Sequence, residues 1–248
     1  MISLSGGIDI ASVQRRLDAE RRATIPGLLK TSSARSIADA AANVPNWTLV
    51  TRLAGRHMDL DAHGMTQLPD AKLVEFEKRV HAEAREGFQY LYETYPLYDK
   101  AHAGTLRTEA PALAELFDWL NGEEFLDLMR SVLGVPEIGF ADAQLTCYRG
   151  GHFLTTHDDA VAGKNRVAAY ILSLSEGWEP HWGGQLQFFS PAGDVEAALV
   201  PRFNTLSLLK VPQPHAVLPV APYARLPRYS ITGWLRTGHD PARAPRAA

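Results

Sequence analysis

The second half of the chain is divided into short apolar segments, and this division limits what the chain can fold into. From Gly139 onward, glycine and proline separate runs of strand length that are rich in β-branched and aromatic residues. The runs cover residues 143–148, 167–175, 184–189, 205–211 and 228–235. Several short strands joined by turns are typical of a β-sandwich or a β-barrel. We therefore predict a β-rich core over residues 139–238.

The first half has a different pattern and reads mostly as helix. The predicted helices cover residues 9–23, a segment capped by Ser32 or Ser33 that runs through Asn43, and residues 70–94, 110–121 and 123–133. The longest one carries apolar residues at helical spacing, namely Leu73, Phe76, Val80, Ala84, Phe88 and Leu91. One or two strands are expected between residues 47 and 60. We predict one catalytic domain, with residues 1–138 as a mostly helical flank and a frayed tail after Asp240.

Composition excludes several classes of partner. The 248 residues are 46% hydrophobic and carry a formal net charge of −3, which argues against nucleic acid as a partner. No apolar run is long enough to span a membrane, and the N-terminus lacks the basic and apolar regions of a secretory signal. Cys147 is the single cysteine, so no internal disulfide is possible. Together these features predict a cytoplasmic protein.

A pair of metal-ligating residues follows a tight turn in the second half. After Gly150-Gly151, an extended segment leads to His157 and Asp159, and His215 lies far downstream behind another predicted strand. Two histidines and one carboxylate on one face of an octahedron are the ligands that non-haem Fe(II) uses, with the remaining positions open. His and Asp two residues apart can share one face of an extended segment. The alternative is that the three are unrelated surface groups.

The same His-x-acidic pattern occurs twice more. His81 and Glu83 lie in the long predicted helix, where residues two apart do not face each other, so we expect a surface pair. His57, Asp59, Asp61 and His63 would share one face of a strand and could form a metal site. A solvated strand face explains this segment better.

A lone arginine on the last predicted strand suggests an anion site. Arg228, Ser230, Thr232 and Trp234 share one face by the period of two. The planar guanidinium can make two charge-assisted hydrogen bonds to one carboxylate, and Ser230 can add another. The alternative is an exposed strand face with Arg228 in water. Arg225 is a nearby competitor, but Pro227 separates it from the strand.

These residues, in this order, resemble the Fe(II)/2-oxoglutarate-dependent dioxygenases, and most of all the prolyl 4-hydroxylase-like group. The resemblance covers about residues 139–237. The motifs that carry it are Tyr148-x-x-Gly151-x-Phe153-x-x-x-His157-Asp158-Asp159, Trp182-Gly183-Gly184-Gln185-Leu186, Pro201-x-x-Asn204-x-Leu206, Pro214-His215-Ala216-Val217 and Arg228-Tyr229-Ser230-Ile231-Thr232-Gly233-Trp234. The resemblance implies a double-stranded β-helix (jelly-roll) core with the N-terminal helices packed on it.

It also implies the site. His157, Asp159 and His215 would bind Fe(II), and Arg228 would bind the distal carboxylate of 2-oxoglutarate with help from Ser230. Tyr148 matches a family tyrosine that touches the cosubstrate, although a tyrosine at the edge of the core would look the same. O2 is the second cosubstrate, ascorbate is a candidate reductant, and no residue needs to act as a general base.

Three functions fit these residues. The first is hydroxylation of a C–H bond in a protein or peptide, on a prolyl residue. The second is hydroxylation of a small molecule such as an amino acid or a secondary metabolite. The third is a metal-binding jelly-roll protein without catalysis, which would leave Arg228 without a role.

Overall fold

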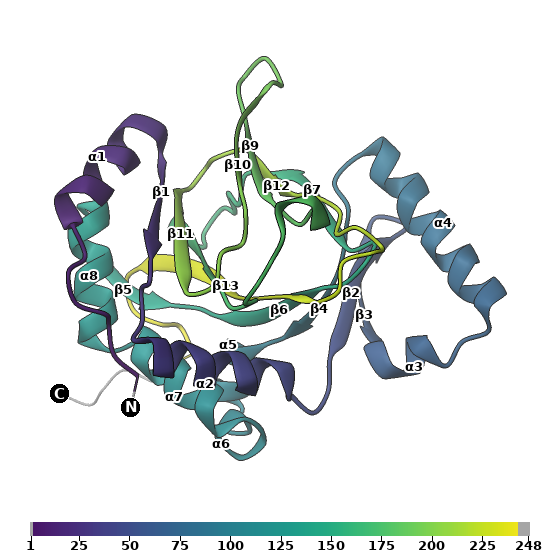
Figure 1. The fold of residues 1–248 in the computed structure, drawn as a ribbon, viewed down its shortest axis with the longest axis horizontal. Helices are drawn as coiled ribbons and strands as arrows, with labels where there is room; N and C mark the ends of the chain where they lie inside the picture. The colour runs from purple at the N-terminus through teal and green to yellow at the C-terminus, as the bar shows by residue number, and fades with distance from the viewer. Residues whose placement is uncertain (1, 243–248) are drawn as a thin grey trace.

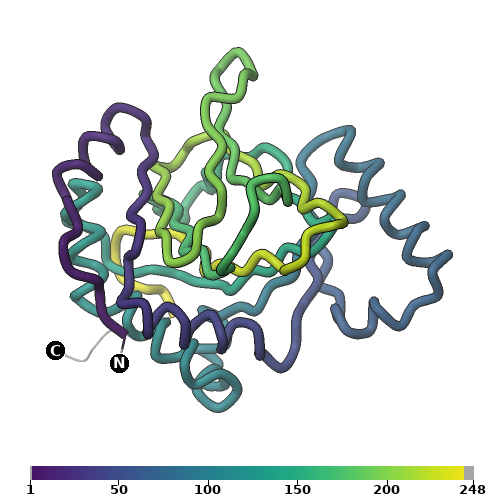
Figure 2. The backbone as a smooth tube through the Cα atoms, in the orientation of Figure 1, coloured from purple at the N-terminus to yellow at the C-terminus, as the bar shows by residue number. Residues whose placement is uncertain are grey.

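A strongly curled antiparallel sheet forms the centre of the computed structural model, which describes residues 2–242, and helices lie on the outer side of the sheet (Figure 1). Along the sheet the strands follow the order β1-β11-β8-β13-β6-β4-β7-β12-β9-β10, and β2, β3 and β5 branch from this path. The chain trace shows that the sheet folds over itself around a central space (Figure 2). The predicted jelly-roll core is confirmed.

The strands and helices have the following bounds. The strands are β1 (Arg22–Pro26), β2 (Thr48–Leu53), β3 (Arg56–Asp61), β4 (Tyr90–Tyr95), β5 (Ile138–Ala141), β6 (Gln144–Tyr148), β7 (Phe153–His157), β8 (Arg166–Ser173), β9 (Leu186–Phe189), β10 (Val195–Leu199), β11 (Thr205–Lys210), β12 (His215–Val217) and β13 (Arg228–Thr237). The helices are α1 (Ile10–Glu20), α2 (Thr31–Ala42), α3 (Ala62–Thr66), α4 (Asp70–Glu86), α5 (Leu97–His102), α6 (Leu106–Glu109), α7 (Pro111–Leu120), α8 (Glu123–Leu133) and the 3-10 turn η1 (Pro180–Trp182).

The central strands are buried on both faces, which explains their continuous apolar sequences. On β8, Tyr170 and Leu172 belong to the large core that the sheet shares with α2, α7 and α8. The alternate residues Ala169 and Ile171 belong to a second apolar cluster inside the curl. The helices therefore close one side of the sheet, and the other side surrounds the interior of the barrel.

The longest predicted helix is wrong at its C-terminal end. α4 stops at Glu86, Gly87 follows, and β4 begins at Tyr90. Phe88 and Leu91 continue the helical spacing by coincidence, but Leu91 belongs to a strand that pairs with β2, β6 and β7. Burial of alternate residues in the sheet outweighs the local helical pattern here, since β-structure depends strongly on its neighbours.

Other boundaries also differ from the prediction. The first helix ends at Glu20, and the chain continues into β1, which pairs with β11. α2 already begins at Thr31 with no side-chain cap, so neither Ser32 nor Ser33 caps it. The predicted strands between residues 47 and 60 are confirmed as β2 and β3. The frayed tail expected after Asp240 falls mostly on residues 243–248, which lie outside the described residues. Within residues 2–242, no helix has the length and apolar character needed to cross a bilayer.

Candidate metal centre and cosubstrate pocket

The three predicted metal ligands meet at one point. β7 and β12 are antiparallel neighbours, and His157 lies opposite His215 in the register. The Nε2 atoms of His157 and His215 lie 3.4 and 3.5 Å from the two carboxylate oxygens of Asp159. The ligand atoms of all three residues lie within 4.8 Å of one another, and no other group of this kind occurs among the described residues.

Backbone carbonyls fix which nitrogen each histidine offers. His157 Nδ1 lies 3.0 Å from the carbonyl oxygen of Thr155, and His215 Nδ1 lies 2.8 Å from that of Gln213. A carbonyl can only accept a hydrogen bond, so Nδ1 carries the hydrogen in both rings and Nε2 keeps its lone pair. Both lone pairs therefore belong to the nitrogens beside Asp159, which is how protein metal sites orient histidine ligands.

The charge states suit a divalent cation. Burial acts to raise the pKa of Asp159, but the proximity of His157 and His215 outweighs it and holds this pKa below its usual value. Burial, together with His157, lowers the pKa of His215. The site thus presents one carboxylate and a neutral imidazole at neutral pH, and these are the forms that bind metals.

The inward face of β13 carries polar groups without partners. Arg228 is 2% exposed and Ser230 is fully buried. Within residues 2–242, no hydrogen-bond partner exists for three buried atoms on alternate residues of this face: Arg228 Nε, Ser230 Oγ and Thr232 Oγ1. Buried polar groups are normally satisfied, so such a row indicates a ligand with several oxygens. A dicarboxylate such as 2-oxoglutarate fits this set of donors, and the exposed alternative for Arg228 is wrong.

The triad and the β13 face line one cavity of about 390 Å³. Tyr148 lines it as well, with its ring centroid 5.1 Å from Arg228 Cζ and 5.0 Å from the centroid of Tyr92. Burial raises the pKa of Tyr148 and, to about 12, that of Tyr92, so both phenols stay protonated. Five of the six residues predicted for the site therefore line this cavity; Ser230 is fully buried on the same strand and does not line it, and Arg225 is exposed.

Two glycines allow the chain to pass close to this cavity. A Cβ on Gly183 would lie 2.1 Å from the carbonyl oxygen of Pro219. A Cβ on Gly184 would lie 3.1 Å from Arg228 Cδ, and Gly184 has a left-handed φ of +66°. Through Gly184, the Trp182-Gly183-Gly184 motif thus packs against the Arg228 side chain.

Sequence analysis missed one wall of the cavity. Phe88, Tyr90, Tyr92 and Arg166 line it, and the aromatic residues come from β4 and the segment before it. The signal was the period of two between Tyr90 and Tyr92 directly after Gly87, which the longer helical pattern obscured.

The alternative metal site at residues 57–63 does not form. His63 belongs to α3 and Asp61 caps that helix, so neither side chain joins His57 and Asp59. His57 instead lies 2.6 Å from the hydroxyl of Tyr90 and 2.9 Å from Asp59 Oδ1. His81 is exposed on α4, as predicted.

Residues 143–236 match the sequence model of the 2OG-Fe(II) oxygenase superfamily. A prolyl-4-hydroxylase from Pseudomonas putida shares the fold with a TM-score of 0.58 and 19% identity, over 92% of this chain and 99% of that one. A prolyl hydroxylase from Trichoplax adhaerens, solved with a peptide of hypoxia inducible factor, has a TM-score of 0.56 and 16% identity over 92% and 89%.

The 2-oxoglutarate-dependent epimerase SnoN of nogalamycin biosynthesis also shares the fold, with a TM-score of 0.58 and 11% identity, over 94% of this chain and 84% of that one. The common fold extends through the N-terminal half, and the match in sequence lies in the half that carries the triad and β13. Residues 143–236 therefore carry the sequence pattern of the 2OG-Fe(II) oxygenase superfamily, on a fold shared with solved members of that superfamily.

Proposed function

We propose that this oxygenase binds Fe(II) through His157, Asp159 and His215 and hydroxylates a prolyl residue of a protein or peptide. The observation that carries the site assignment is the row of unpartnered polar groups on β13, of which Arg228 and Thr232 line the same cavity as the triad. The match of residues 143–236 to the sequence model of the 2OG-Fe(II) oxygenase superfamily favours catalysis over a metal-binding jelly roll without activity.

Each residue has a defined task in this proposal. The two Nε2 lone pairs and the Asp159 carboxylate bind the metal. Arg228 neutralises the distal carboxylate of 2-oxoglutarate, Ser230 donates a hydrogen bond to it, and Tyr148 packs against the guanidinium. When bound, the iron would activate O2 with 2-oxoglutarate as the co-reductant: one oxygen atom of O2 would go into the succinate formed, with CO2, from 2-oxoglutarate, and the other into a substrate C–H bond. The apolar wall of Tyr92 and Leu186 excludes water.

The rim of the cavity favours a polypeptide as the substrate. Phe88 and Val161 line the cavity and are 43% and 48% exposed. Exposed apolar side chains around an opening are typical of surfaces that bind other proteins. Two solved prolyl hydroxylases share the fold, one of them with a bound peptide.

A small-molecule substrate is the second candidate. A volume of about 390 Å³ lies within the range of small-ligand pockets, and an epimerase from an antibiotic pathway shares the fold.

The test measures product and turnover together. The protein, supplied with Fe(II), ascorbate and 2-oxoglutarate, is incubated with proline-containing peptides and with the same peptides carrying alanine in place of proline. We expect succinate formation and, by mass spectrometry, one added oxygen only on the proline peptides. Asp159→Ala should reduce succinate to the level without enzyme. Oxygen added to amino acids or metabolites but to no peptide would favour the second candidate, and absence of succinate with the unmodified protein would contradict both.

A further inference from the structure

The ligand Asp159 has an unusual backbone conformation. Its φ is +64°, in the left-handed region that non-glycine residues seldom adopt. The conformation turns the aspartate back toward His157, two residues earlier in the chain. A backbone that is disfavoured on its own persists only where neighbouring groups hold it.

Arg166 is the group that holds it. Its Nη1 donates a hydrogen bond of 2.9 Å to the carbonyl oxygen of Asp159. The guanidinium lies flat against an aromatic ring, with Arg166 Cζ 3.5 Å from the ring centroid of Trp234. Arg166 begins β8 and Trp234 belongs to β13, and these two strands are paired. The hydrogen-bond donor is therefore fixed by two central strands of the sheet.

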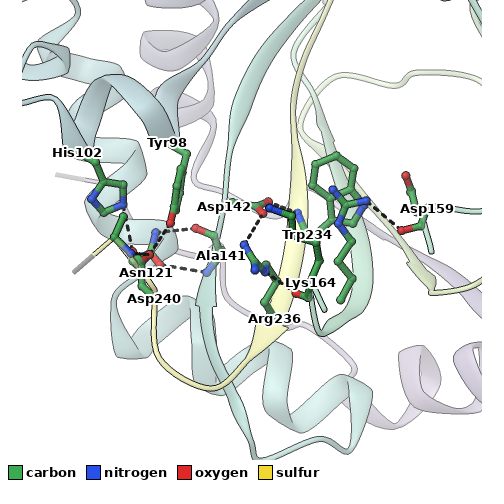
Figure 3. A network of polar contacts seen from close by, with 12 residues as sticks. Tyr98, His102, Asn121, Ala141, Asp142, Asp159, Lys164, Trp234, Arg236 and Asp240 are labelled. Atoms are coloured by element: carbon green, nitrogen blue, oxygen red, sulfur yellow. Dashed lines mark hydrogen bonds and ion pairs between the residues drawn. The ribbon is translucent and has the colours of Figure 1, made fainter. Parts of the chain in front are cut away.

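The aromatic ring is itself held in place. The backbone N–H of Trp234 donates to Asp142 Oδ1 over 2.7 Å, and Arg236 Nη1 lies 3.6 Å from Asp142 Oδ2. Arg236 Nε donates to the carbonyl oxygen of Lys164 over 2.6 Å. Figure 3 shows these contacts as one connected network that reaches Asp159. Residues 159–164 are thus tied at both ends, and Arg166 controls the end that carries the ligand.

We propose that Arg166 is a positioning residue for the metal site, because it keeps the Asp159 carboxylate turned toward the two histidines. The inference rests on the proposed function, in which Asp159 is a metal ligand. Arg166 is not one of the three candidate ligands, and its role is to hold the backbone of Asp159. Partners that orient a ligand from outside in this way usually change metal affinity by about 10- to 100-fold.

The direction in which Arg166→Gln changes metal affinity distinguishes a positioning role of Arg166 from a purely electrostatic effect of its charge. Arg166 is a cation that contacts a ligand of a divalent cation. If only its charge mattered, Arg166→Gln would remove repulsion and strengthen metal binding. If Arg166 positions Asp159, the same change weakens binding, since the carboxylate is free to turn away.

The test measures binding of Co(II) alone, by titration and by the visible absorption of the bound ion, which depends on ligand geometry. We expect Arg166→Gln to bind Co(II) about 10- to 100-fold more weakly, with an altered spectrum. Arg166→Lys keeps the charge but cannot stack as a flat group, so it should restore only part of the affinity. Arg130→Gln is the matched control, because Arg130 also donates to a backbone carbonyl, that of Ile138, from α8.

Each outcome is decisive. Unchanged or stronger Co(II) binding by Arg166→Gln would overturn the inference, and so would an equal loss in Arg130→Gln, which would indicate general loosening of the fold. If Arg166→Gln does not fold, Arg166→Lys replaces it, and binding as tight as in the unmodified protein then contradicts positioning. Asp159→Ala reports on the proposed function separately: if it binds Co(II) normally, the metal site itself lies elsewhere.

Discussion

At the scale of single residues, Arg228 is the most informative side chain. It is almost fully buried, and no carboxylate among residues 2–242 forms an ion pair with it. A buried charge without a partner destabilises a protein strongly, so this arginine requires an anion for its function. The ring of Tyr148 lies 5.1 Å from Arg228 Cζ, and the backbone at Gly184 packs against Arg228 Cδ, so both contacts fix the position of the guanidinium.

Arg228→Ala should raise the KM for 2-oxoglutarate by about 10- to 100-fold, which corresponds to the loss of a charged hydrogen bond. Succinate formation at several 2-oxoglutarate concentrations measures the effect. Arg225→Ala is the control, since Arg225 is exposed three residues away and should leave the KM unchanged. An unchanged KM in Arg228→Ala would refute the proposal that Arg228 binds 2-oxoglutarate.

His152 should make stability depend on pH. Burial lowers the pKa of His152 below the 6.5 of an unfolded histidine, and its Nδ1 has no partner among the described residues. Below pH 6.5 the unfolded chain binds more protons than the folded one, so the free energy of unfolding should fall as the pH falls, by up to about 1.4 kcal/mol per unit.

Urea unfolding of the metal-free protein at pH 7 and pH 5.5 measures this slope. His152→Gln should reduce this slope, to which the buried His215 also contributes, whereas His63→Gln, at an exposed histidine, should not change it. Equal slopes in all three proteins would exclude His152 as the source.

At the scale of elements, the sequence predicts best the strands that are buried on both faces. β8, β11 and β13 stand out as apolar runs between turns, and the alternation on β13 alone places Arg228 and Ser230 on one face. β4 could not be predicted in the same way, because its partners in β6 and β7 follow about 50 to 64 residues later and its apolar spacing matches that of the preceding helix. The candidate ligands His157, Asp159 and His215 could be predicted because a short motif encodes them, whereas Arg166 comes close to Asp159 only through the curl of the sheet.

Gly184→Ala tests whether the turn before β9 holds the Arg228 side chain in its position for binding 2-oxoglutarate. The new Cβ would press on Arg228 Cδ, Val220 and Trp178 at 3.1–3.3 Å, so both stability and affinity for 2-oxoglutarate should fall. Gly177→Ala is the matched control, because it has a similar φ of +72° but no atom within 4 Å. It should lose only the about 1–2 kcal/mol of left-handed strain and keep its KM. Equal KM values would show that the contact is unimportant.

At the scale of the whole molecule, the site joins parts of the chain that are distant in sequence. β12 has three residues and depends on its neighbours β7 and β9, so a ligand that links His157 with His215 should reinforce this side of the barrel.

Mn(II) and 2-oxoglutarate at 100 times their dissociation constants should each add about 2.7 kcal/mol to stability. For a chain of this length, each such increment raises the Tm by about 5–11 °C. Differential scanning calorimetry with and without EDTA measures the shift. His157→Ala should show no shift with the metal, and a full shift in that variant would place the metal elsewhere.

β4 has a consequence for any attempt to use the catalytic half alone. This strand comes from the N-terminal half and lies between β6 and β7, where it connects the two parts of the barrel. A fragment limited to the catalytic motifs would present two open strand edges at the cavity, and open edges invite pairing between molecules. The catalytic motifs therefore cannot be moved into another protein unless β4 is moved with them, because β4 carries Tyr90 and Tyr92 and joins β6 to β7.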